Sequence, residues 1–228
     1  MSKDQMLRDL LSRQAVLPIM TIRSEEAGLR IAESLLAGGL TAMEITLRTA
    51  EGAAAISAIR RRFPEMAIGA GTLLRPEDFD RAATAGAQFG VSPGMDRPLA
   101  EEALKRSLPF LPGVQTASEV MTAVGYGLQT LKFYPARAAG GTTVLADFGN
   151  IFQNVMFVPT GKLTQADVPE YLALKNVLCA GGSWMTPADR VAAEDWPAIR
   201  ALAGTAAAMA RTAGQPSGVH DIFVRSRS

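Results

Sequence analysis

Two charged side chains interrupt runs of residues that are otherwise apolar. Lys132 lies within "LKFYP" (131–135), and Glu44 lies within "AMEITL" (42–47). Burial disfavours the charged ammonium, and a neutral lysine amine attacks ketones to form a Schiff base. A carboxylate beside that amine can carry protons. The pair therefore indicates carbonyl chemistry. Alternatively, Lys132 extends its ammonium to water and Glu44 is a helix N-cap or pairs with Arg48.

Arg48 and Thr72 are candidates for binding a carboxylate. Arg48 follows "EITL", and its planar guanidinium can donate two parallel hydrogen bonds to a carboxylate, although it can also neutralise Glu44. Thr72 ends "GAGT" and can donate its hydroxyl to the same carboxylate. A helix N-cap is the equal alternative for Thr72.

Two glycine-rich turns indicate a phosphate site. They are "PTGK" (159–162) and "GGSW" (181–184), and each follows an apolar run. Exposed backbone N–H groups and a helix N-terminus together attract an anion. The candidate phosphate ligands are Gly161, Lys162, Gly182 and Ser183.

These side chains need a framework that brings them together. Short apolar runs suited to buried strands alternate eight times with amphipathic segments suited to helices. The expected strands begin at Val16, Thr41, Ala67, Gln88, Pro109, Thr130, Val155 and Val177. Eight such units predict an α/β fold, a (β/α)8 TIM barrel, whose catalytic groups lie at the C-terminal ends of the strands. A doubly wound open sheet is the alternative, but the first strand lacks the G-x-G-x-x-G turn of its dinucleotide-binding form.

The chain length of 228 residues fits a single domain. We expect an extra N-terminal helix over 1–15, the barrel core over 16–187, C-terminal helices over 188–214 and a tail over 215–228.

Composition restricts the partners. The formal net charge of +1 gives no field to attract nucleic acid or a membrane, so we expect neither as a partner. Cys179 is the single cysteine, and the first residues lack the apolar core of a signal peptide, which favours the cytoplasm. The single histidine, His220, and the lack of clustered ligands argue against a metal, and we expect no cofactor.

Several blocks of the sequence resemble the KDPG aldolase family, the 2-keto-3-deoxy-6-phosphogluconate (KDPG) and 4-hydroxy-2-oxoglutarate (KHG) aldolases. "LPIMTI", "EITLRT", "GAGTLL", "LKFYPA", "FVPTG" and "LCAGGSW" occur in order between about Leu17 and Pro187. The resemblance implies a metal-free class I aldolase, a homotrimeric carbon–carbon lyase of the Entner–Doudoroff pathway. Its expected reaction is reversible cleavage of KDPG to pyruvate and glyceraldehyde 3-phosphate. Cleavage of KHG to pyruvate and glyoxylate is a second candidate.

The resemblance also implies roles for individual residues. Lys132 matches the Schiff-base lysine and Glu44 the general acid/base. Arg48 and Thr72 match the groups that hold the pyruvate carboxylate. Gly161 and Ser183 match phosphate-contacting positions.

Lys162 departs from the family pattern, which commonly reads "PTGG" where this chain reads "PTGK". A side chain there can narrow the phosphate pocket, place an ammonium beside the phosphate, or face solvent. We favour the phosphate contact. The alternative function for the whole chain is a noncatalytic barrel that binds 2-oxo acids and phosphates, for which an amine at Lys132 would not be needed.

Overall fold

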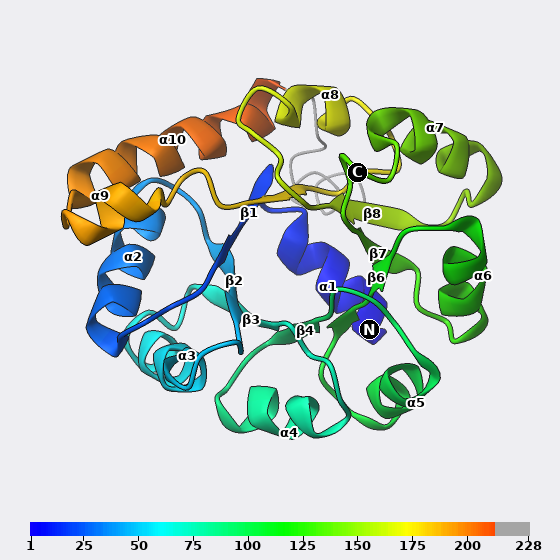
Figure 1. Ribbon diagram of the computed structural model, residues 1–228, viewed down its shortest axis with the longest axis horizontal. Helices are drawn as coiled ribbons and strands as arrows, with labels where there is room; N and C mark the ends of the chain where they lie inside the picture. The colour runs from blue at the N-terminus through cyan, green and yellow to red at the C-terminus, as the bar shows by residue number, and fades with distance from the viewer. Residues whose placement is uncertain (213–228) are drawn as a thin grey trace, which may run out of the picture.

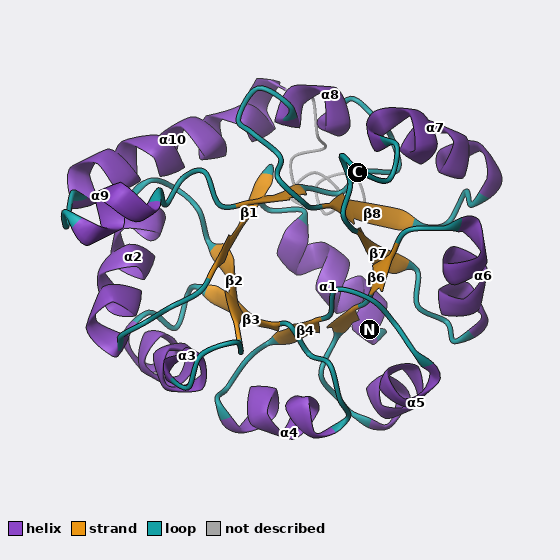
Figure 2. Cartoon of the chain, in the orientation of Figure 1, coloured by secondary structure: helices purple, strands orange, loops and turns teal. Residues whose placement is uncertain are grey.

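The computed structural model describes residues 1–212. The tail predicted over 215–228, with His220, lies outside the described residues. The chain has an α/β fold in which parallel strands form a curled sheet around an interior, with most helices packed outside it (Figures 1 and 2). No helix within residues 1–212 combines the length and the apolar character that a bilayer-spanning segment needs.

Within residues 1–212, nine short strands form two sheets. The six-stranded sheet has the order β5-β4-β3-β2-β1-β9, and the three-stranded sheet has the order β6-β7-β8. Their bounds are β1 (Val16–Met20), β2 (Ala42–Thr46), β3 (Ala67–Gly71), β4 (Phe89–Val91), β5 (Phe110–Leu111), β6 (Gly113–Val114), β7 (Thr130–Phe133), β8 (Met156–Pro159) and β9 (Ala180–Gly182).

The two sheets meet at two places. Only Pro112 separates β5, which pairs with β4, from β6, which pairs with β7. The sequence predicted one strand here, but proline has no N–H to donate, so the ladder is interrupted at that residue. On the other side, parallel bridges join Phe157 to Val177 and Thr160 to Gly181, which links β8 to the segment that ends in β9.

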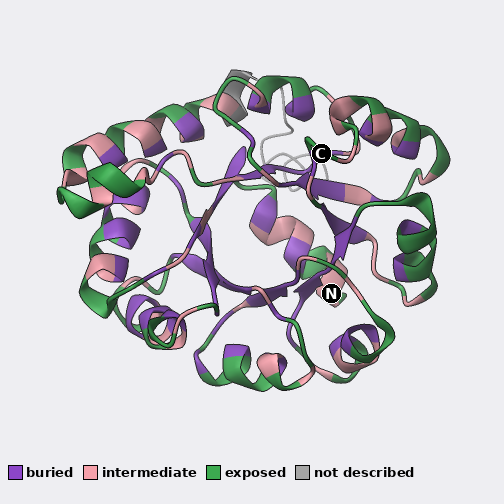
Figure 3. Ribbon diagram, in the orientation of Figure 1, coloured by how far each residue is buried: buried purple, intermediate pink, exposed green. Residues whose placement is uncertain are grey.

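Helices alternate with the strands along the chain. They are α1 (Lys3–Leu11), α2 (Glu25–Ala37), α3 (Glu51–Arg62), α4 (Glu77–Thr84), α5 (Arg97–Lys105), α6 (Ala117–Gly125), α7 (Gly141–Ile151), α8 (Val168–Leu172), α9 (Ala188–Ala192) and α10 (Trp196–Thr212). Their buried residues face the strands and their exposed residues face outward (Figure 3). At α6, Thr116 and Glu119 form a capping box that satisfies backbone N–H groups at the helix start.

Alternate strand residues belong to two separate apolar clusters, because successive side chains of a strand point to opposite faces. Val16 and Met43 belong to the cluster between the strands and the outer helices. Their neighbours Leu17 and Ala42 belong to the cluster inside the curled sheet, which also contains Leu7 and other residues of α1. The interior face of each strand is therefore set by its apolar pattern.

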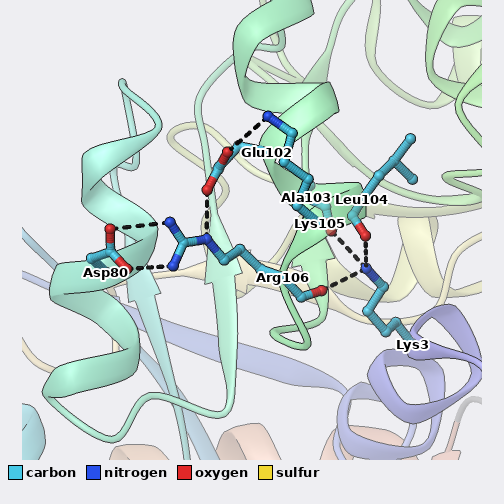
Figure 4. Close-up of polar contacts among 7 residues, drawn as sticks. All are labelled: Lys3, Asp80, Glu102, Ala103, Leu104, Lys105 and Arg106. Atoms are coloured by element: carbon cyan, nitrogen blue, oxygen red, sulfur yellow. Dashed lines mark hydrogen bonds and ion pairs between the residues drawn. The ribbon is translucent and has the colours of Figure 1, made fainter.

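A half-buried lysine attaches α1 to the rest of the fold (Figure 4). Lys3 Nζ donates to the carbonyl oxygens of Ala103 at 2.6 Å, Leu104 at 3.3 Å and Arg106 at 2.7 Å, at the C-terminal end of α5. Cations are favoured at helix C-termini, where carbonyls lack helical partners. The Arg106 side chain in turn pairs with Asp80 of α4.

Candidate active site

Lys132 of β7 and Glu44 of β2 meet inside the curled sheet. Their strands belong to different sheets and lie on opposite sides of the interior (Figure 1). Lys132 Nζ lies 3.3 Å from both Oε1 and Oε2 of Glu44. The two side chains are 8% and 2% exposed. This ion pair replaces the alternative in which Glu44 pairs with Arg48.

The strand pattern directs Lys132 inward. Leu131 and Phe133 both belong to the outer cluster, so Lys132 between them faces the interior. Two residues further on, on the same face, the Tyr134 ring centroid lies 5.8 Å from Lys132 Nζ. The amine is thus flanked by a carboxylate and by an aromatic face, both of which stabilise a positive charge on nitrogen.

A cavity of about 1200 Å³ opens beside this pair. It is lined by residues at and after the C-terminal ends of β1, β2, β7, β8 and β9. Among the lining residues are Thr21, Arg48, Tyr134, Thr160, Gly161, Lys162, Gly182 and Ser183. The candidate phosphate ligands are therefore brought together with Arg48. Lys132 and Glu44 do not line the cavity, because they lie within their strands and are almost fully buried.

Arg48 projects from the segment after β2 toward the segment after β1. Its Nη2 donates to Thr21 Oγ1 at 3.0 Å. The guanidinium is exposed and has no ion-pair partner among residues 1–212, so most of its donors remain available to an anion.

Thr72 is the predicted ligand that the structure does not bring to the cavity. It follows β3 with a left-handed backbone, at φ 66°, and is absent from the cavity lining. The N-cap alternative is wrong, because α4 begins at Glu77 and its N-cap residue is Pro76.

The turn after β8 contains two successive residues with positive φ. Gly161 has φ 124°, and a β-carbon there would lie 3.0 Å from Cα of Pro135. Lys162 has φ 55°, a left-handed conformation that costs a non-glycine residue about 1–2 kcal/mol. Its side chain is exposed and has no ion-pair partner among the described carboxylates. The lysine therefore keeps a backbone conformation suited to glycine while adding a cation at the cavity.

A family profile described as KDPG and KHG aldolase matches residues 7–202. The chain belongs to the KDPG/KHG aldolase family. The match confirms the family resemblance of the sequence blocks between Leu17 and Pro187.

Individual aldolases agree with this assignment. The KHG/KDPG aldolase of Escherichia coli K12 is 42% identical over 194 residues, covering 85% of this chain and 91% of that protein. The 2-dehydro-3-deoxy-phosphogluconate aldolase of Pseudomonas aeruginosa is 44% identical over 195 residues, covering 85% and 89%.

Solved aldolase structures also resemble this fold. The KDPG aldolase of Legionella pneumophila, with pyruvate captured as a covalent carbinolamine, has a TM-score of 0.85 and 38% identity, covering 87% of this chain and 96% of that one. The Zymomonas mobilis KDPG aldolase with 3-phosphoglycerate has a TM-score of 0.84 and 38% identity, covering 89% and 95%.

Two cavity residues of this aldolase-family chain were missed by the sequence reasoning. Thr21 accepts the hydrogen bond from Arg48, and Tyr134 covers Lys132. Each of them is the first residue after a strand, β1 or β7. Strand alternation directs both side chains to the interior, because Thr21 lies two residues after Ile19 and Tyr134 two residues after Lys132. The expectation that functional polar residues lie at the C-terminal ends of strands, applied to the first strand, would have found Thr21.

Proposed function

We propose that this chain is a class I aldolase that cleaves KDPG reversibly to pyruvate and glyceraldehyde 3-phosphate through a Schiff base on Lys132. The observation that carries the proposal is a nearly buried amine within 3.3 Å of both oxygens of a buried carboxylate, in a member of this family. The carbinolamine of pyruvate in the Legionella relative supports the same chemistry.

The first half of the mechanism forms the imine. Glu44 accepts a proton from the Lys132 ammonium, which leaves a neutral amine that attacks the C2 ketone carbon of the substrate. Glu44 returns this proton to the hydroxyl of the resulting carbinolamine, which then loses water and leaves Glu44 ionised. The product is a protonated imine whose positive nitrogen can accept electrons from the C3–C4 bond.

The second half breaks and reforms bonds at C3. Glu44, directly or through water, takes the proton of the C4 hydroxyl. The electron pair of the C3–C4 bond moves into the imine, which gives an enamine and releases glyceraldehyde 3-phosphate. Glu44 then returns the proton to C3, and water hydrolyses the imine to free pyruvate and Lys132.

The anionic groups of the substrate fit the cations at the cavity. In this proposal Arg48 and Thr72 hold the carboxylate next to C2. Gly161, Lys162, Gly182 and Ser183 hold the phosphate. The support is that all of these except Thr72 line one cavity.

KHG is the second proposed substrate, and its cleavage would yield pyruvate and glyoxylate. It carries a carboxylate where KDPG carries its phosphorylated end, so it uses the same imine chemistry without the phosphate contacts. The name of the Escherichia coli relative includes both substrates.

We also infer the finer architecture. The segments β5 and β6 are two halves of one strand, and the bridges from β8 toward β9 close the sheet into an eight-stranded (β/α)8 barrel. On this interpretation α1 is an extra helix at one end of the barrel, and the part of the chain that the structure describes, residues 1–212, forms one domain. The homotrimer and the cytoplasmic location stay predictions.

Borohydride reduction in the presence of pyruvate tests the proposed function. Reduction converts the imine to a stable secondary amine, so peptide mass analysis should find pyruvate attached to Lys132. Lys132→Met should abolish the adduct, and Lys162→Met should retain it, since Lys162 is the exposed rival amine. An adduct on Lys162, or none at all, would contradict the proposal and favour a noncatalytic binding protein.

A further inference from the structure

We infer that Thr21 is a positioning residue: its hydroxyl holds the Arg48 guanidinium in the orientation that binds the substrate carboxylate. The inference rests on the proposed function. It assigns to Thr21 a role that acts through Arg48 and requires no contact between Thr21 and the substrate.

Three polar side chains form a short hydrogen-bonded chain from the interior to the cavity. Arg48 Nη2 donates to Thr21 Oγ1 at 3.0 Å, and Thr21 Oγ1 lies 2.9 Å from Thr46 Oγ1. Thr46 is 2% exposed, Thr21 is half-buried, and Arg48 is exposed. Thr21 therefore connects the long Arg48 side chain at the cavity to the buried hydroxyl of Thr46 inside the sheet.

Strand register places these three hydrogen-bonded side chains next to the Lys132–Glu44 pair, toward the C-terminal ends of the strands. Ile19 of β1 pairs with Glu44 of β2, so two residues further along each strand Thr21 and Thr46 face the same interior side. The carboxylate of a 2-oxo acid is bonded directly to the C2 carbon that Lys132 attacks. A guanidinium held in the layer next to Glu44 is therefore well placed to orient C2.

The hydrogen-bonding capacity of these groups permits the role. A hydroxyl has one proton and two lone pairs, so Thr21 can accept from Arg48 and still donate to Thr46. A guanidinium has five N–H donors, and the contact with Thr21 uses one of them. The remaining donors suffice for a two-point contact with a carboxylate.

The backbone around Arg48 does not depend on Thr21. Thr49 Oγ1 donates to the Ile22 carbonyl at 2.7 Å, and the Leu47 N–H donates to the Gly71 carbonyl at 2.8 Å. These contacts tie the segment to both neighbouring strand ends. Removing the Thr21 hydroxyl is therefore expected to free the Arg48 side chain and leave the loop in place.

Thr21→Val and Thr21→Ser form the matched pair for the test, because valine keeps the shape and loses the hydroxyl while serine keeps the hydroxyl. The readout is the pyruvate concentration that gives half-maximal borohydride trapping on Lys132, together with kcat and KM for KDPG. For Thr21→Val we expect the half-maximal concentration and KM to rise about three- to tenfold, the range of one hydrogen bond, with kcat nearly unchanged. Thr21→Ser should stay within about twofold of the parent.

A double-mutant cycle separates positioning from a direct or structural role. In an Arg48→Ala background, Thr21→Val should have no further effect, because the side chain that it positions is gone. An equal effect in both backgrounds, or no effect in the parent, would overturn the inference.

Thermal unfolding checks that the variants are folded, and Thr21→Ala replaces Thr21→Val if the latter does not fold. If the parent itself traps no pyruvate, the proposed function fails first, and this inference fails with it.

Discussion

Gly71 of β3 provides the space that the Glu44 side chain occupies. A β-carbon at Gly71 would lie 2.8 Å from both Cγ and Cδ of Glu44 and would overlap Oε1. The carboxylate has little freedom to move aside, because it is buried against Lys132. We predict that Gly71→Ala displaces Glu44 from the amine and lowers kcat by about 10²-fold, as small misplacements of a reacting group do.

Gly125→Ala is the matched control for this substitution. Gly125 lies on α6, where nothing is within 4 Å of an added β-carbon, so the same change should leave kcat unaltered. Steady-state release of pyruvate from KDPG measures both variants. If Gly71→Ala turned over like the parent, the Glu44 position would not matter to the reaction.

Replacing Glu44 with glutamine should separate imine formation from turnover. The amide keeps the size of the carboxylate but cannot accept the proton of the C4 hydroxyl. Loss of general acid/base catalysis lowers rates by about 10²–10⁴-fold, which is the fall in kcat that we expect for Glu44→Gln. Borohydride reduces the imine irreversibly and the adduct accumulates with time, so pyruvate should still be trapped on Lys132 when the imine forms more slowly. Turnover close to that of the parent would show that another group carries the proton.

The sequence could predict which residues face the interior, because that depends on local alternation. The apolar neighbours of Lys132 and Glu44 required that both be buried, and burial without a partner would be costly for either charge. All eight predicted apolar runs contain strands or, at Pro112, two strand pieces. These features follow from nearest neighbours along the chain.

Contacts across the interior could not be predicted, because they depend on strand register and on how far the sheet curls. Glu44 had two plausible cationic partners, and the structure selects Lys132, 88 residues away, over Arg48, four residues away. The position of Thr72 outside the cavity lining has a related cause. Its left-handed φ changes the direction of its side chain after β3, and strand alternation does not anticipate such a change.

Cys179 should make stability fall at alkaline pH. Burial raises the pKa of its thiol from the ordinary value of 9.0 to about 12. Between these values the unfolded thiol has lost its proton while the folded thiol keeps it. The folded state therefore binds more protons, and the free energy of unfolding falls as pH rises through this window, by at most about 1.4 kcal/mol per pH unit.

Denaturant unfolding of the parent and of Cys179→Ala across this window measures the contribution of the thiol. Cys179→Ala should be less stable at neutral pH because it leaves a cavity, but its stability should fall less steeply above pH 9.0. If the free energy of unfolding fell with pH at the same rate in both proteins, the Cys179 thiol of the parent would ionise equally in its folded and unfolded states.

Lys162 should affect binding of the phosphorylated substrate alone, because its ammonium lies at the cavity end proposed for the phosphate. We expect Lys162→Asn to raise KM for KDPG by about two- to fivefold, the range of an ion pair at an exposed position, without changing KM for KHG. Asparagine tolerates the left-handed backbone at this position, so the substitution removes the charge without straining the turn. Lys105→Asn removes another exposed cation, one outside the cavity lining, and should change neither KM. A rise in KM for both substrates would mean that Lys162 acts on the 2-oxo acid portion that they share. An unchanged or lower KM for KDPG would instead indicate a lysine that faces solvent or narrows the phosphate pocket.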